Sequence, residues 1–272
     1  MSNLFSLEGK VAVVTGAGGV LCGEISKGLA QAGAKIALLD LRLDMAEKAA
    51  EAIRAEGGDA AAFECNVLER ESIEKAKDAV LAKFGQVDIL LNGAGGNHPK
   101  GTTSPEMPFF DIPQDAVQWV FNLNILGTIM PTQVFGKLFA DQDSGCVVNI
   151  SSMSAYHPLT RTVAYSAAKA GVTNFTEWMA VHFNQEYSKK IRVNAIAPGF
   201  LLTQQNYYLM IDEKTGGNTP RGETVLRKTP MDRFGEPKEL VGAVVFLCSD
   251  AAQFVNGIVL PVDGGFNAFS GV

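Results

Sequence analysis

A tyrosine and a lysine with the spacing Tyr-x-x-x-Lys stand at Tyr165 and Lys169. If this segment is helical, the two side chains share one face of the helix. A phenol with a pKa near ~10 exchanges its proton poorly at neutral pH, but an adjacent ammonium stabilises the phenolate and lowers that pKa. The pair therefore predicts acid–base chemistry at the phenol, although the same spacing also arises by chance on solvated helices.

Two further polar residues fit the same chemistry. Ser152 follows an apolar strand pattern at 147–150, and ligands bind at the carboxyl ends of parallel strands, where a hydroxyl can polarise a substrate oxygen. Asn124 lies inside a helical pattern at 114–139, although asparagine is a mediocre helix former. It either has a buried hydrogen-bonding task, such as holding a proton-relaying water, or lies at the surface. The candidate catalytic set is Asn124, Ser152, Tyr165 and Lys169.

A glycine-rich turn, Thr15–Gly23, joins the first strand pattern to a helical one. Glycines at such a turn let the backbone approach a pyrophosphate, whose charge is met by N–H groups at the helix N-terminus. Tight turns also use glycine for steric reasons alone, but the order strand, turn and helix favours dinucleotide binding. The predicted cofactor contacts here are Gly16, Gly18, Gly19, Val20 and Leu21.

The second strand pattern ends in Asp40. A carboxylate at this position accepts hydrogen bonds from the adenosine ribose hydroxyls and repels a 2′-phosphate, which favours NAD over NADP. Arg42 leaves the alternative open, because a guanidinium can meet that phosphate.

Short aliphatic runs alternate with helical patterns along the chain, which predicts a parallel sheet with right-handed crossovers. Consecutive apolar residues are typical of parallel strands covered on both faces. We expect one domain over 1–272, a Rossmann-type doubly wound α/β fold of about seven strands with helices on both faces. Residues 200–230 form a long insertion, either a substrate loop or a variable surface excursion. The expected strands are 11–14, 36–39, 60–63, 89–91, 147–150, 192–196 and 258–261, and the expected helices are 23–32, 44–56, 69–84, 114–139, 163–187 and 236–248.

Composition narrows the classes of partner. The formal net charge is −6 and the sequence contains no long basic run, which argues against nucleic acid. Four scattered cysteines without a C-x-x-C pair or a histidine cluster predict buried thiols in a reducing compartment and no metal site. The longest uncharged stretch, 116–136, is too polar for a membrane helix, and no signal-peptide pattern is present. We therefore expect a cytoplasmic protein.

Together, the motifs Thr15-Gly16, Asn92-Gly93-Ala94-Gly95, Asn124, Ser152, Tyr165-x-x-x-Lys169 and Pro198-Gly199 resemble the short-chain dehydrogenase/reductase family over nearly the whole chain. The resemblance implies an NAD(P)-dependent enzyme, commonly tetrameric. Tyr165 is then the general acid/base, Lys169 lowers its pKa and holds the ribose, Ser152 orients the substrate and Asn124 belongs to the proton relay. It also implies Asn66 near the adenine and Thr203 near the carboxamide. The further cofactor contacts expected are Val67, Asn92, Gly93, Ala94, Tyr165, Lys169, Pro198 and Gly199.

The sequence departs from the family pattern at the cofactor end. The usual turn has glycines where this chain has Val20 and Cys22, and Asn66 replaces the usual adenine-side aspartate. The additional glycines Gly18, Gly19 and Gly23 offer a compensation.

The expected substrate contacts are His98, Ser152, Arg161 and Tyr165. Arg161 can pair with a substrate carboxylate or simply be solvated at a helix start, and a lone loop histidine is often only polar surface. The strings at 15–22, 92–99, 158–161 and 261–266 resemble a subgroup that interconverts D-fructuronate and D-mannonate, which predicts a sugar-acid substrate.

Two alternatives remain open: a gluconate 5-dehydrogenase or other polyol dehydrogenase of the same family, and a dinucleotide sensor without catalysis. Large apolar side chains on the helical patterns 114–139 and 163–187 fit either a subunit interface, and with it a homotetramer, or core packing.

Overall fold

The fold is built around one sheet of seven parallel strands. A computed structural model describes residues 3–204 and 206–271. The strand order is β3-β2-β1-β4-β5-β6-β7, and every neighbouring pair is parallel. The chain thus starts in the middle of the sheet, winds outward to β3 and then returns to build the other half. The strands are β1 (Val11–Thr15), β2 (Lys35–Asp40), β3 (Ala60–Glu64), β4 (Ile89–Asn92), β5 (Gly145–Ile150), β6 (Ile191–Pro198) and β7 (Val259–Val262).

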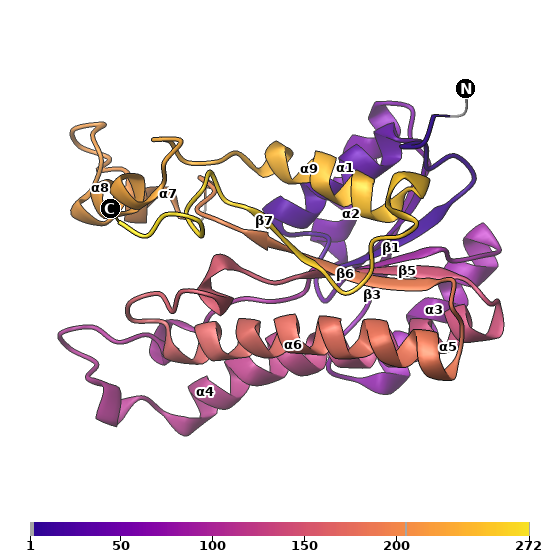
Figure 1. Ribbon diagram of the computed structural model, residues 1–272, viewed down its shortest axis with the longest axis horizontal. Helices are drawn as coiled ribbons and strands as arrows, with labels where there is room; N and C mark the ends of the chain where they lie inside the picture. The colour runs from indigo at the N-terminus through magenta and orange to yellow at the C-terminus, as the bar shows by residue number, and fades with distance from the viewer. Residues whose placement is uncertain (1–2, 205, 272) are drawn as a thin grey trace.

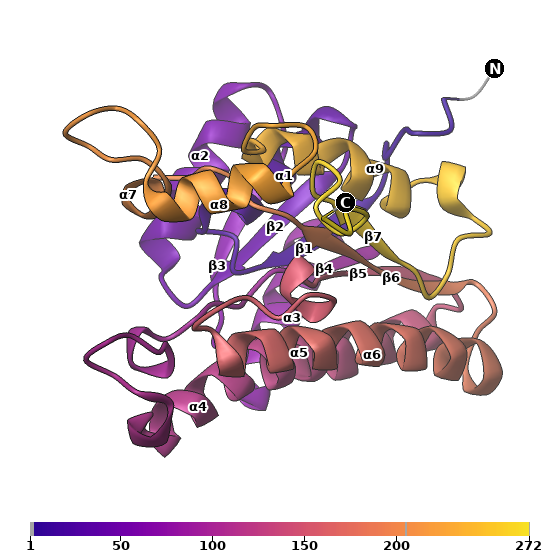
Figure 2. The ribbon, with the colours of Figure 1, turned by 60° about the vertical axis from the view of Figure 1, so that its left-hand side comes forward.

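Helices cover both faces of this sheet (Figures 1 and 2). On one face lie α1 (Val20–Gln31), α2 (Leu43–Ala55) and α9 (Val241–Cys248). On the other lie α3 (Arg70–Phe84), α4 (Gln114–Phe121), α5 (Gly127–Asp141) and α6 (Val163–Glu186). Two short helices, α7 (Tyr207–Met210) and α8 (Pro220–Lys228), pack on each other beyond the end of β6, away from the N-terminus.

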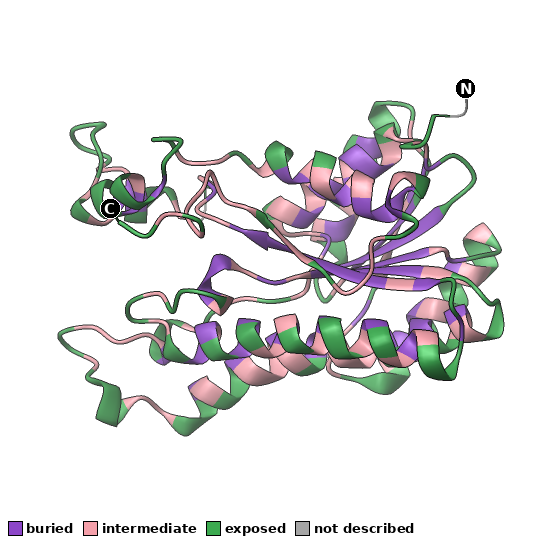
Figure 3. Ribbon diagram, in the orientation of Figure 1, coloured by how far each residue is buried: buried purple, intermediate pink, exposed green. Residues whose placement is uncertain are grey.

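Alternate residues of the central strands enter two separate cores. In β1, Ala12 and Val14 join the layer with α1 and α9, whereas Val11 and Val13 join the layer with α5 and α6. Because both faces are covered, the central strands are buried almost throughout, while the outward sides of the helices are exposed (Figure 3). This burial explains the consecutive apolar residues of the strand patterns.

The predicted doubly wound α/β fold and its seven strands are confirmed. The single helix predicted over 114–139 is wrong in one respect: a π-helical turn, Asn122–Leu126, separates α4 from α5. The 200–230 segment is not wholly irregular, since it carries α7 and α8.

The four cysteines are buried and free. Within residues 3–204 and 206–271, no helix combines the length and apolar character needed to cross a membrane.

Candidate active site

A cleft of about 750 Å³ opens at the carboxyl ends of β1, β2, β4, β5 and β6. Parallel α/β sheets bind ligands at this edge, next to the point where the strand order reverses, which here lies between β1 and β4. Most of the sequence-predicted residues meet there. Those lining the cleft are Gly16, Gly19, Val20, Leu21, Asp40, Asn66, Val67, Gly93, Ala94, Ser152, Tyr165, Pro198, Gly199 and Thr203.

The glycine-rich turn is held close to the end of β4. The Thr15 hydroxyl accepts hydrogen bonds from the backbone N–H groups of Gly93 and Ala94, at 3.1 and 3.2 Å. Gly16 has a φ of +65°, and a Cβ on it would lie 2.8 Å from the Ala94 Cα. Only glycine combines that dihedral with that approach. At the departures from the family pattern, Val20 lies at the rim and the Cys22 thiol fills the space beside Gly93.

The positive end of a helix dipole and a carboxylate lie near each other at the ends of β1 and β2. The first suits an anion and the second suits sugar hydroxyls. Helix α1 begins at the cleft with no acidic residue in its first turn, so its positive N-terminal end faces the cleft uncompensated. Asp40 accepts hydrogen bonds from the N–H groups of Gly18 and Arg42, each at 2.9 Å. A carboxylate offers about four acceptor sites, so acceptor capacity remains for a ligand. Gly18 thus acts on the cleft through Asp40 and does not line it.

The Tyr165 phenol and the Ser152 hydroxyl meet in the cleft. Desolvation raises the pKa of Tyr165 above its ordinary value, and a hydrogen bond from Ser152 opposes part of that rise. The lysine Nζ lies 5.7 Å from the centre of the tyrosine ring, and a lowering of this pKa by Lys169 stays a prediction. Tyr165 therefore holds its proton at neutral pH.

Lys169 is buried behind Tyr165 on α6. Its Nζ donates a hydrogen bond of 2.8 Å to the Ile150 carbonyl at the end of β5. Burial lowers the pKa of Lys169 to about 8. The group is therefore close to its titration point at physiological pH.

Asn124 lies in the π-helical turn and is completely buried. Its side-chain amide donates to the carbonyls of Gly96 and Val120 at 2.7 and 2.8 Å, and its Oδ1 accepts from the Gly96 N–H at 3.2 Å. A Cβ on Gly95 would lie 2.8 Å from that oxygen and 3.2 Å from Lys169 Nζ. The turn therefore brings Asn124 and Lys169 against the same side of one glycine, and π-turns are frequent at functional sites.

Three predicted residues do not line the cleft. The Asn92 side chain is buried away from the cleft, where it donates to Thr132 and Asn149, both at 2.9 Å. His98 packs its ring against Trp119, with 5.3 Å between the ring centres. Arg161 lines a neighbouring cavity of about 420 Å³ that shares Leu159 with the cleft.

Sequence reasoning missed cleft residues outside the motifs. Trp119 and Phe200 add aromatic walls. Asn206 fixes the turn before α7, because its side chain accepts from the Thr203 N–H and donates to the Leu201 carbonyl, both at 2.8 Å. An asparagine shortly after a threonine in a loop was the available signal.

Known proteins resemble the chain over nearly its full length. The family model described as Enoyl-(Acyl carrier protein) reductase matches residues 19–267. A solved structure of a candidate D-mannonate oxidoreductase from Haemophilus influenzae, with bound NAD, is 49% identical with a TM-score of 0.93, and the match covers 98% of each chain.

Two characterised relatives act on polyols or sugar acids by name. D-threitol dehydrogenase of Mycolicibacterium smegmatis is 34% identical over 96% of this chain and 94% of its own. The 5-keto-D-gluconate 5-reductase of Escherichia coli K12 is 32% identical over 97% of this chain and 98% of its own.

The pKa of Lys169 gives a prediction for stability. Between pH 8 and 10.5 the unfolded chain binds a proton at this lysine that the folded chain has released, so the free energy of unfolding rises with pH by on the order of 3 kcal/mol. Lys169→Met lacks this contribution. In urea unfolding of cofactor-free protein, the free energy of unfolding should rise more from pH 7.5 to pH 10 in wild type than in Lys169→Met. Lys189→Met, changed at an exposed position, serves as control. Equal gains in wild type and Lys169→Met would contradict the assignment.

Proposed function

Since the chain belongs to the short-chain dehydrogenase/reductase family and is an oxidoreductase of alcohol or ketone groups, we propose that it uses NAD to interconvert a ketone and a secondary alcohol on a sugar acid. The proposed pair is D-fructuronate and D-mannonate, the reaction of a D-mannonate oxidoreductase (fructuronate reductase). The observation that carries the reaction type is the meeting of Tyr165 and Ser152 in one cleft with Lys169 behind them.

The residues of the cleft fit a dinucleotide. The approach of Gly16 to Ala94 leaves no room for a Cβ, and the N-terminus of α1 is free of acidic side chains. We assign the pyrophosphate to this turn and the adenosine ribose to Asp40, whose negative charge disfavours a 2′-phosphate. The NAD in the 49% identical structure supports the same choice. Arg42 lines the cleft, and its backbone N–H supports the Asp40 carboxylate.

The proton on Tyr165 suits ketone reduction. When bound, the nicotinamide supplies or accepts the hydride. A phenol with a raised pKa carries its proton at neutral pH and can give it to the oxygen of the reduced ketone, while the Ser152 hydroxyl polarises that oxygen. Lys169 would hold the nicotinamide ribose, and Asn124 would support Lys169 through the backbone at Gly95 and Gly96.

The choice of a sugar acid as substrate rests on the names of the relatives and on Arg161, which can pair with a carboxylate. The candidate D-mannonate oxidoreductase and the 5-keto-D-gluconate 5-reductase both carry names of sugar-acid enzymes. The second candidate function is a gluconate 5-dehydrogenase or other polyol dehydrogenase, which the D-threitol relative favours. A catalytically silent dinucleotide sensor is disfavoured, because binding alone gives no use for a hydrogen bond between Ser152 and Tyr165 in the cleft.

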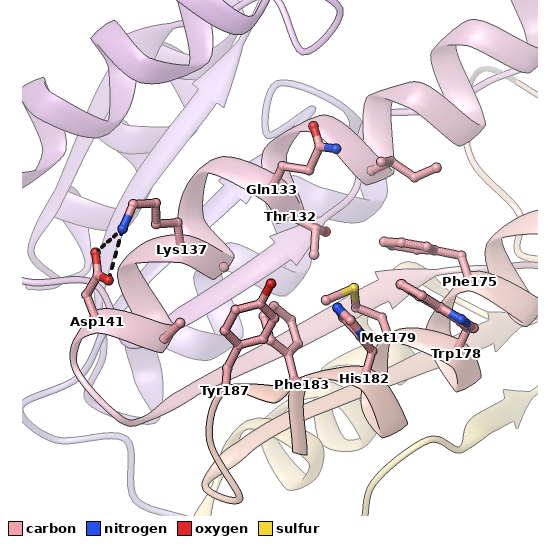
Figure 4. A pocket seen from close by; sticks show the side chains of 13 residues that line it. Thr132, Gln133, Lys137, Asp141, Phe175, Trp178, Met179, His182, Phe183 and Tyr187 are labelled. Carbon is pink, nitrogen blue, oxygen red and sulfur yellow. Dashed lines mark hydrogen bonds and ion pairs between the residues drawn. The ribbon is translucent and has the colours of Figure 1, made fainter. Parts of the chain in front are cut away.

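We also propose that the protein acts in the cytoplasm as a homotetramer. Four free, buried cysteines suit a reducing compartment. A groove of about 430 Å³ lies between α5 and α6, far from the cleft residues, with Phe175, Trp178 and Tyr187 around it (Figure 4). Trp178 and Tyr187 are 56% and 59% exposed. Apolar patches of this kind on a helix pair suit burial against a second copy of the chain.

The reaction is tested by mixing the enzyme with D-fructuronate and NADH and following NADH absorbance. Wild type should oxidise NADH when D-fructuronate is present. In Tyr165→Phe, kcat should fall by about 10²- to 10⁴-fold or more, because the proton donor is gone. NADH titration should show unchanged binding. Tyr156→Phe, which alters an exposed tyrosine in the segment before α6, is the control. Turnover of neutral polyols without turnover of any keto sugar acid would favour the second candidate.

The cofactor choice is tested with Asp40→Asn, which keeps the shape and one acceptor oxygen but removes the charge. Like charges brought together cost several kcal/mol, so removing this one should lower the preference for NADH over NADPH by at least about 10-fold in kcat/KM. Asp44→Asn, changed in the first turn of α2, is the control. An unchanged preference in Asp40→Asn would contradict the ribose assignment.

The assembly is tested by sedimentation equilibrium. Wild type should have four times the 29.0 kDa mass of one chain, and Trp178→Asp should give smaller species because a charge would be buried at the interface. Phe254→Asp, at another exposed aromatic residue, is the comparison. A monomeric wild type would rule the tetramer out.

A further inference from the structure

The segment between β6 and β7 carries an arginine with an unusual environment. Arg221 stands in the first turn of α8, where the Thr219 hydroxyl caps the helix by accepting from the Gly222 N–H at 3.0 Å. Gly222 packs so closely on the Met210 carbonyl that a Cβ there would collide with it. These two contacts fix the backbone of Arg221 against α7.

The Nε of Arg221 is buried and has no hydrogen-bond partner. A buried polar atom without a partner is costly, and more so when it belongs to a charged group. Three other arginines of the chain, Arg54, Arg70 and Arg233, each pair with a glutamate. No ion pair within residues 3–204 and 206–271 involves Arg221.

The charge that acts on Arg221 belongs to a second guanidinium. Burial and then the positive charge of Arg161 lower the pKa of Arg221. The chain thus brings two cations together from separate segments, and no carboxylate among the described residues bridges them. Two guanidiniums with vacant donors form the natural complement of a carboxylate, which accepts from both.

Arg161 is held in position at a cost to the backbone. Its φ is +74°, in the left-handed region that side-chain-bearing residues avoid. The Thr103 N–H donates to the Arg161 carbonyl at 3.0 Å and ties this turn to the 98–103 segment. Backbone strain of this kind gathers at ligand-binding positions.

The position of Arg161 relative to the reacting centre is suitable. It precedes Tyr165 by four residues, in the turn before α6, and its cavity shares Leu159 with the cleft. In D-fructuronate the carboxylate stands at the other end of the carbon chain from the ketone. A carboxylate site to one side of Tyr165 would therefore leave the ketone at the phenol.

We propose that Arg221 and Arg161 together bind the carboxylate of the sugar-acid substrate, so that α8 contributes a specificity-determining residue. The proposal rests on the proposed function and names the groups that select an acid over a neutral sugar. Arg161 gives a fixed donor beside the cleft, and Arg221 supplies a second from the segment that follows β6. A neutral sugar would leave both guanidiniums without an anion.

The test compares D-fructuronate with D-fructose, which carries CH₂OH in place of the carboxylate, using NADH for both. Arg221→Gln should raise KM for D-fructuronate about 10- to 100-fold, the loss expected for a hydrogen bond to a charged group. The values of kcat, of KM for NADH and of kcat/KM for D-fructose should stay within about 2-fold. Arg221→Lys should recover part of the loss. Arg227→Gln, on the same helix, is the matched control and should leave KM unchanged.

A double variant tests whether both arginines hold one group. Arg161→Gln alone should also raise KM for D-fructuronate. In the double variant, KM should rise by less than the product of the two single increases, because the groups share a partner. Arg161→Gly should raise the thermal midpoint by relieving the left-handed backbone while still raising KM. A merely structural arginine would not show that combination.

The outcomes separate the two proposals. Turnover of D-fructuronate by wild type with an unchanged KM in Arg221→Gln would overturn the arginine pair and leave the proposed function standing. A wild type that reduces no keto sugar acid with either NADH or NADPH would overturn the proposed function, and the arginine pair with it. Equal losses on D-fructuronate and D-fructose would also overturn the pair, because they would show a role independent of the carboxylate.

Discussion

The candidate site depends on one buried ammonium and the single carbonyl that receives it. Lys169 donates to Ile150 at 2.8 Å, and this bond joins α6 to the end of β5 beneath the cleft. Burying an ammonium is costly, and the cost appears as a pKa lowered to about 8. Everything around the group must therefore be fixed, since a small movement of α6 would leave the charge without its acceptor. The same bond sets the position of Tyr165, one helical turn earlier.

The π-helical turn at Asn122–Leu126 meets a second constraint next to the first. Its extra residue lets Asn124 turn toward the backbone at Gly96, where its amide group makes three hydrogen bonds. Gly95 packs against that amide and the lysine with no space for a side chain. If α4 and α5 formed one uninterrupted helix, a different face of that helix would meet the backbone at Gly96. The irregularity of the helix is thus part of the way in which the site is held.

The sequence predicts well whatever is periodic and poorly whatever depends on contacts between distant segments. Strands such as Val11–Thr15 are apolar on successive residues because two layers cover them, and that signal is local. The π-turn carries no glycine or proline to announce it. Asn92 belongs to a conspicuous motif, but the alternation of side chains along β4 turns it into the core. Arg221 looks like a solvated residue at a capped helix start, and only the fold brings it near Arg161.

The chemistry and the choice of substrate are consequently carried by different parts of the chain. The acid–base group stands on a long helix packed along a buried strand, where displacement is costly. The proposed carboxylate ligands stand on a strained turn and on the short α8, which contacts mainly α7. Replacing side chains on α8 disturbs few core contacts, so this segment can change its preferred substrate without disturbing Lys169 and Tyr165. Polyol and sugar-acid names among relatives that share one fold are what such a division would produce.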